Sequence, residues 1–259
     1  MVTLIAASTA LAVMTALRVL GAEAHARRTA PFLVLGPAAL FMSVSGDALF
    51  AAVAAWQLAT LAVATTRTNR RSTVLWSVVA GLLLGAMVML SYGLLLIGPL
   101  ALAVLAIARS WRPLPIAAGA ALVVVLGFAA AGFAWWEGLL ALRERYWRGL
   151  ASDRPGLYWT WANLAALILC AGPVLGAGLA QLRRGVDRTV LWLTGAATTA
   201  VLLATVSQMS RAEVERIWLP FVPWLLVSTA LLPARWRKPA LAIQLGTALL
   251  MEHLLYTTW

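Results

Sequence analysis

The chain has 259 residues, of which 63% are hydrophobic and only 11% are charged. Soluble domains contain about 25% charged residues, so this composition predicts an integral membrane protein and excludes a disordered chain. The single cysteine, Cys170, excludes a disulfide scaffold. A net charge of +11 would suit a nucleic-acid-binding protein, but the positions of the charges argue against one.

Ten apolar stretches are long enough to cross a bilayer as a helix, which takes about 17–25 residues. They cover residues 1–22, 30–46, 48–66, 73–91, 93–109, 114–135, 157–181, 189–207, 218–234 and 239–257. The second and third stretches meet at residues 45–47, and the fourth and fifth at residues 91–93. Each of these pairs is also compatible with one long helix followed by a re-entrant segment. The sequence therefore predicts an all-α, polytopic transmembrane helix bundle of about ten spans, forming a single domain over residues 1–259.

Basic residues concentrate in alternate connections between these stretches. Fourteen of the 20 Lys and Arg residues lie there: Arg18, Arg27, Arg28, Arg67, Arg70, Arg71, Arg109, Arg112, Arg183, Arg184, Arg188, Arg235, Arg237 and Lys238. The six arginines of the other connections are balanced by acids. Because positive residues stay cytoplasmic, we expect a multi-pass plasma-membrane protein with its neutral connections and both termini outside the cell. The excess charge is then a signature of topology, and no nucleic-acid partner is predicted.

The first span begins without a charged segment before it, and Arg18 lies on the wrong flank for a signal peptide. An N-terminus outside the cell is unusual in such a chain. We therefore expect the chain to begin partway into a longer architecture.

Polar groups inside the predicted spans are few, the strongest being Gln57, Asn163, Gln181 and Gln244. Ion-coupled carriers usually need acids or histidines within the membrane, which argues against a transporter. The Gly-Pro pairs at residues 36–37, 98–99 and 172–173 are compatible with the broken helices of transporters or with ordinary kinks.

Chemistry-bearing residues gather instead at three places on the predicted outer side. The first is the turn at residues 45–47, where Asp47 is placed either to cap the helix that starts at Ala48 or to hold an acceptor hydroxyl or a metal.

The second place is the outer loop 136–159. Its apolar residues recur at spacings of three and four, with arginines between them, which predicts an amphipathic helix lying in the outer interface. Its arginines, and Arg154 in the turn that follows, are compatible with a solvated surface or with a phosphate clamp.

The third place is the charged loop 207–218. Ser210 and Glu213 have the spacing of a capping box, which predicts a helix start at Ser210. The spacings Glu213 to Arg216 and Arg211 to Glu215 predict ion pairs on that helix. A purely structural role for these charges is the alternative to a binding role.

Together these three places resemble the membrane core of GT-C glycosyltransferases, the superfamily of protein O-mannosyltransferases and lipid A aminoarabinose transferases. The resemblance is carried by Asp47 with the residues around it, by residues 135–138, by Arg154-Pro155 with Tyr158 and Asn163-Leu164, and by residues 211–220. One departure matters: the first helix and first outer loop of that family, with its catalytic aspartate, have no counterpart here. The resemblance then implies either an N-terminally shortened homologue or a site in which Asp47 is the sole acid.

The resemblance implies transfer of a sugar from a polyprenyl-phosphate donor to a hydroxyl on the extracytoplasmic side. Asp47 would deprotonate or orient the acceptor. Arg216 and Arg211 would hold the lipid phosphate, with Glu213 or Glu215 orienting them and Arg154 as a further phosphate ligand. The sequence shows no set of metal ligands with a characteristic spacing, and binding of a divalent ion at Asp47 is left as an alternative. The alternatives are a non-catalytic membrane protein and a lipid or solute transporter.

Overall fold

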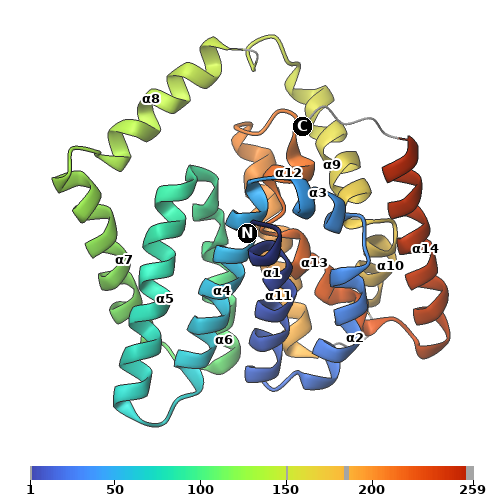
Figure 1. The fold of residues 1–259 in the computed structure, drawn as a ribbon, viewed down its shortest axis with the longest axis horizontal. Coiled ribbons are helices and arrows are strands. Elements are labelled where there is room, and N and C mark those ends of the chain that lie inside the picture. The colour runs from blue at the N-terminus through green and yellow to red at the C-terminus, as the bar shows by residue number, and fades with distance from the viewer. Residues whose placement is uncertain (1, 150, 184–186, 255–259) are drawn as a thin grey trace.

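A computed structural model describes residues 2–149, 151–183 and 187–254 of the chain (Figure 1). Within these ranges the secondary structure is entirely helical, which confirms the predicted all-α class. The helices are α1 (Val2–Val19), α2 (Glu23–Val34), α3 (Ala38–Val44), α4 (Asp47–Thr66), α5 (Arg70–Leu90), η1 (Tyr92–Ile97), α6 (Gly98–Ala108), α7 (Pro113–Ala130), α8 (Trp135–Arg148), α9 (Gly156–Ala171), α10 (Val174–Gln181), α11 (Arg188–Ser207), α12 (Val214–Ile217), α13 (Val222–Leu226), η2 (Val227–Leu231) and α14 (Ala234–Leu254). Arg184 and the end of the last predicted span lie outside the described residues.

Four helices are long and apolar enough to cross a membrane, namely α4, α5, α7 and α11. The pair α9 and α10 makes a fifth candidate if it is counted as one span with a bend of 94°. The ten predicted spans are not confirmed, because several of the stretches divide into shorter helices. Gly36-Pro37 separates α2 from α3, and Pro99 lies at the start of α6 after the 3₁₀ turn η1. Proline lacks the N–H that a continuous helix needs at that position.

The centre of the bundle is α4, which packs against α1 and α5. Ala51, Ala52, Ala54 and Ala55 are fully or almost fully buried on it. Such small side chains let helix backbones approach closely, which is how membrane helices gain contact in the absence of a strong hydrophobic drive.

A second close contact joins α5 to α7. A Cβ atom on Gly81 would overlap the carbonyl oxygen of Ala117, and one on Gly85 would lie 2.6 Å from the Cβ of Val124. Gly81 and Gly85 have the four-residue spacing of the Gly-x-x-x-Gly helix-packing motif. The motif is present in the sequence, and the structure shows that the helix packed on it is α7, although most of α7 is not buried within the described bundle.

The bend between α9 and α10 is filled by a side chain from α14. Gln244 is fully buried, and its amide donates a hydrogen bond to the carbonyl of Ala171 and accepts one from the backbone N–H of Val174 at 3.4 Å. Gly172 between them has φ of +83°. Gln244 therefore pairs backbone groups that the break leaves without helix partners, as is required away from water.

The basic connections lie together in space. In Figure 1 the α1–α2, α4–α5, α6–α7 and η2–α14 connections lie toward the lower end, while α8, α12 and the α3–α4 connection lie at the upper end. These basic connections are thus separated from the turn 45–47, the outer loop 136–159 and the charged loop 207–218. We refer to these as the basic end and the site end.

Candidate functional site

Asp47 is the first residue of α4, at the site end. Its backbone N–H donates to Ser45 Oγ at 3.0 Å, and Ser45 Oγ–H donates to Asp47 Oδ2 at 3.1 Å. Of the two roles considered for Asp47, the hydrogen-bonded cap is not formed: the residue before the helix is Gly46, no side-chain cap is made there, and Asp47 lies in the first turn of α4. The Asp47 carboxylate therefore accepts a hydrogen bond from Ser45 and none from the free backbone N–H groups of the helix start.

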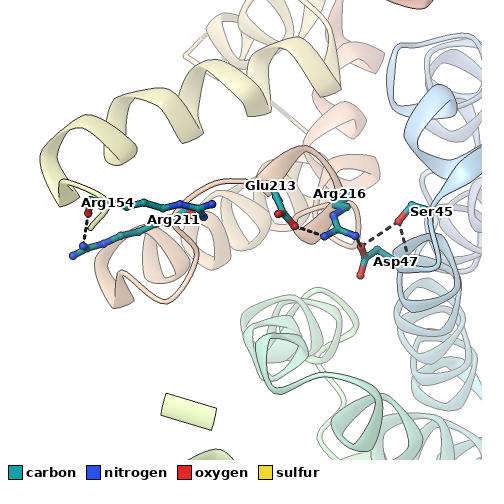
Figure 2. Close-up of polar contacts among 6 residues, drawn as sticks. All are labelled: Ser45, Asp47, Arg154, Arg211, Glu213 and Arg216. Atoms are coloured by element: carbon teal, nitrogen blue, oxygen red, sulfur yellow. Dashed lines mark hydrogen bonds and ion pairs between the residues drawn. The ribbon is translucent and has the colours of Figure 1, made fainter. Parts of the chain in front are cut away.

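Arg216 links Asp47 to the charged loop (Figure 2). Its Nη1 lies 3.6 Å from Asp47 Oδ2, and its Nη2 pairs with Glu213. The predicted Glu213–Arg216 ion pair is thus present. The hydrogen bond that Arg216 donates to Glu213, together with the negative charges of Glu213 and Asp47, raises the pKa of Arg216 above its usual range even though burial lowers it, so this guanidinium is positively charged at any physiological pH.

The loop before α12 does not follow the predicted capping box. α12 begins at Val214, and Ala212 and Glu213 precede it with φ of +90° and +58°. Asn163 of α9, 4% exposed, explains this path: its Nδ2 donates to the Ser210 carbonyl at 2.5 Å, and its Oδ1 accepts from the Ala212 N–H at 3.3 Å. An uncommon backbone conformation in non-glycine residues is retained where the surroundings impose it.

Arg154 and Arg211 form a second group, separate from Asp47 and Arg216 in Figure 2. Arg154 Nη1 donates to the carbonyl of Arg211, and Arg211 Nη1 donates to the carbonyls of Arg154 at 2.5 Å and of Ala151 at 3.1 Å. Their guanidinium groups lie over the rings of Trp159 at 5.2 Å and Trp147 at 4.7 Å. This reciprocal arrangement fastens the outer loop to the charged loop.

Arg211 was expected to form an ion pair with Glu215, but its guanidinium donates hydrogen bonds to backbone carbonyls instead. Glu215 is half-buried beside Arg216, and its carbonyl oxygen lies 3.1 Å from Cys170 Sγ. Burial, and then the charge of Glu213, raise the pKa of the Glu215 carboxyl. Of the predicted site residues, the structure therefore joins Asp47, Glu213 and Arg216, and separately joins Arg154 and Arg211.

The predicted amphipathic helix is present as α8, and it bridges the site end (Figure 1). At its start, Trp135 Nε1 donates to the Val88 carbonyl at 3.0 Å, and its ring lies 5.0 Å from that of Tyr92. At its other end, Tyr146 Oη accepts from the backbone N–H of Arg211 at 2.9 Å. Both ends of α8 are thus fixed to other elements.

Beneath α8 lies a cavity of about 550 Å³. It is bounded by the start of α4, the α5–η1 turn, the end of α11 and the segment from Met209 to Phe221, with Leu139 and Leu142 of α8 above it. The wall is apolar except for the hydroxyl groups of Ser91, Tyr92, Ser207 and Ser210 and the carboxylate of Asp47. Among the described residues that line this cavity, Asp47 is the one charged side chain.

The described ranges hold no group of three or more His, Cys, Asp and Glu side chains close enough to share a metal ion. Asp47 and Glu213 both pair with Arg216. In this structure each of the two carboxylates is thus paired with the same guanidinium.

Sequence reasoning missed Asn163 as a positioning residue and Tyr92 and Trp218 as cavity residues. The polarity of Asn163 within an apolar span was the available signal. Comparisons with protein-family models, with curated proteins and with solved structures find no match for this chain.

Proposed function

We propose that the chain is an integral membrane glycosyltransferase-like protein that transfers a sugar from a polyprenyl-phosphate donor to an acceptor hydroxyl on the extracytoplasmic side. The observation that carries this proposal is the cavity under α8, whose wall is apolar except for a few hydroxyls and the Asp47 carboxylate, with Arg216 3.6 Å from that carboxylate. An apolar wall suits a polyprenyl chain. A guanidinium beside it suits a phosphate.

The roles follow from the two charges. Arg216 would bind the donor phosphate and stabilise the negative charge that grows on it as the bond to the anomeric carbon breaks. Asp47 would accept the proton of the acceptor hydroxyl as its oxygen bonds to that carbon. The products are the glycosylated acceptor and the polyprenyl phosphate, which remains paired with Arg216.

Arg154 and Arg211 take a different place in this proposal from the one that the sequence suggested. Their guanidinium groups already donate to backbone carbonyls, so they serve first to hold α8 over the cavity. Glu213 orients Arg216 through its ion pair. Membrane lipid surrounds the bundle, and the positive-inside distribution of arginines supports a plasma-membrane protein with the site end outside.

The test uses purified protein in proteoliposomes with undecaprenyl phosphate as a binding probe and undecaprenyl-phosphate hexoses as donors. We expect Asp47→Asn to bind undecaprenyl phosphate normally and to lose transfer about 10²–10⁴-fold, as for removal of a general base. Arg216→Ala should weaken binding of the probe and reduce transfer by at least about 100-fold.

Arg148→Ala provides the matched control, because Arg148 also pairs with an acid, Glu144, but on the exposed surface of α8. This variant should bind the probe and transfer sugar as the parent does. Unchanged transfer in both Asp47→Asn and Arg216→Ala would remove the assignment of the site. Absence of probe binding by the parent protein would favour a non-catalytic membrane protein.

A further inference from the structure

A second cavity, of about 440 Å³, lies toward the basic end between α10 and α14. Its volume falls within the range of small-molecule sites in proteins. Val174 and Ala177 of α10 and Ala240 and Ile243 of α14 form apolar walls. Gln181, at the end of α10, and Arg235, at the start of α14, supply its polar lining groups.

The mouth of this cavity carries the features of a membrane interface. Trp236 lines it and is 54% exposed, as expected of an indole at headgroup level. Arg235 is exposed, and within the described part of the chain its guanidinium makes no ion pair or hydrogen bond. Arg237 and Lys238 follow Trp236 in the sequence, so the electrostatic field at this mouth is strongly positive.

We propose that this cavity binds an anionic diacyl phospholipid. An acyl chain would lie along the apolar walls of α10 and α14, with the phosphate at Arg235 and a polar headgroup oxygen at Gln181. Charge complementarity selects the lipid class, because basic pockets between membrane helices at the cytoplasmic side favour anionic headgroups. The site is independent of the sugar-transfer proposal, since it shares no lining residue with the cavity beneath α8.

A lipid bound in this cavity would lie close to the bend between α9 and α10. Pro173 and Val174, which line the cavity, follow Gly172 directly at the 94° bend. Gln244 of α14 fills that bend one residue after Ile243. A bound lipid would therefore bridge the two helices on the basic side of the bend.

The experiment measures retention of phosphatidylglycerol against phosphatidylcholine by native mass spectrometry of the full chain released from mixed-lipid nanodiscs. We expect the parent to retain phosphatidylglycerol preferentially and Arg235→Gln to weaken that binding about fivefold, the effect of one basic residue near the membrane surface. Ala177→Trp, which fills the cavity without changing the charge, should abolish retention.

Arg71→Gln is the matched control, because Arg71 is also an exposed arginine in a basic connection but lies outside the cavity. It should retain phosphatidylglycerol as the parent does. Equal losses in Arg71→Gln and Arg235→Gln would show a diffuse charge effect and overturn the proposal. So would retention by an Ala177→Trp protein whose melting temperature in phosphatidylcholine matches the parent, or displacement of the lipid by soluble glycerol phosphate at equal concentration.

Discussion

Glu215 shows how the charged loop differs from a solvated surface helix. Four of the six residues from Arg211 to Arg216 are charged. Arg211, Glu213 and Arg216 make specific hydrogen bonds or ion pairs, whereas Glu215 is half-buried. Burial and the neighbouring Glu213 raise the pKa of its carboxyl above the ordinary value of about 4.5. The folded chain therefore holds this proton more tightly than the unfolded chain does.

Because the folded state binds more protons, the contribution of Glu215 to stability declines as the pH rises from about 4.5 through the raised folded-state pKa. We predict that Glu215→Gln, which keeps the side-chain shape and removes the charge, melts at a higher temperature than the parent above this window and at the same temperature below it. Melting in detergent between pH 4 and pH 8 checks this. Glu144→Gln on exposed α8 is the control, and a pH-independent difference for Glu215→Gln would contradict the prediction.

Sequence spacing identified part of this residue-level arrangement. The three-residue separation of Glu213 and Arg216 predicted their ion pair, which the short helix α12 provides. The same reasoning failed for Arg211 and Glu215, because it assumed one continuous helix from Ser210. Asn163, 47 residues before Ser210 in the sequence, donates a hydrogen bond to the Ser210 carbonyl, and the helix begins only at Val214. No local pattern contains that contact.

At the scale of elements, the 94° bend between α9 and α10 depends on Gly172. Its φ of +83° and ψ of +156° belong to a region that is essentially restricted to glycine. A Cβ atom there would also overlap the amide of Gln244. We predict that Gly172→Ala destabilises the fold by about 1–3 kcal/mol from backbone strain, with a further loss from displacement of Gln244.

Gly176→Ala is the matched control, since a Cβ at Gly176 meets nothing within 4 Å, and it should be neutral or mildly stabilising. Unfolding in increasing SDS measures both variants. Adding Gln244→Ala to Gly172→Ala relieves the overlap but leaves the Ala171 carbonyl without its partner, so stability should not return to the parent level. Equal stability of Gly172→Ala and Gly176→Ala would show that the bend does not need glycine.

Hydropathy located the helices better than it located their ends. The stretches 48–66, 73–91 and 189–207 correspond to α4, α5 and α11, and the amphipathic spacing in 136–159 corresponds to α8. The stretch 30–46 became two helices, because a hydropathy average does not register the break at Gly36-Pro37. Whether such a break yields a kink or a 94° bend depends on a distant partner such as Gln244.

At the scale of the whole molecule, the arrangement gathers the excess of positive charge at one end. The four basic connections visible at the lower end of Figure 1 come from sequence positions more than 200 residues apart, yet the fold places them together. The charge pattern predicted this grouping, because a helix that crosses the bundle returns every second connection to the same end. The cavity beneath α8 was not predictable in this way, since its walls come from elements distant in the chain.

This separation predicts which end faces the cytoplasm, and cysteine labelling in intact cells tests it. Cys170 is buried, and Cys170→Ser keeps a hydrogen-bond donor toward the Glu215 carbonyl while removing the native thiol. In that background, Ala141→Cys on exposed α8 should react with a membrane-impermeant maleimide, whereas Thr68→Cys, exposed between α4 and α5, should react only after the cells are opened. Positive-inside orientation requires this order. The reverse order would place α8 and Asp47 in the cytoplasm, where an extracytoplasmic transferase has no access to its acceptor.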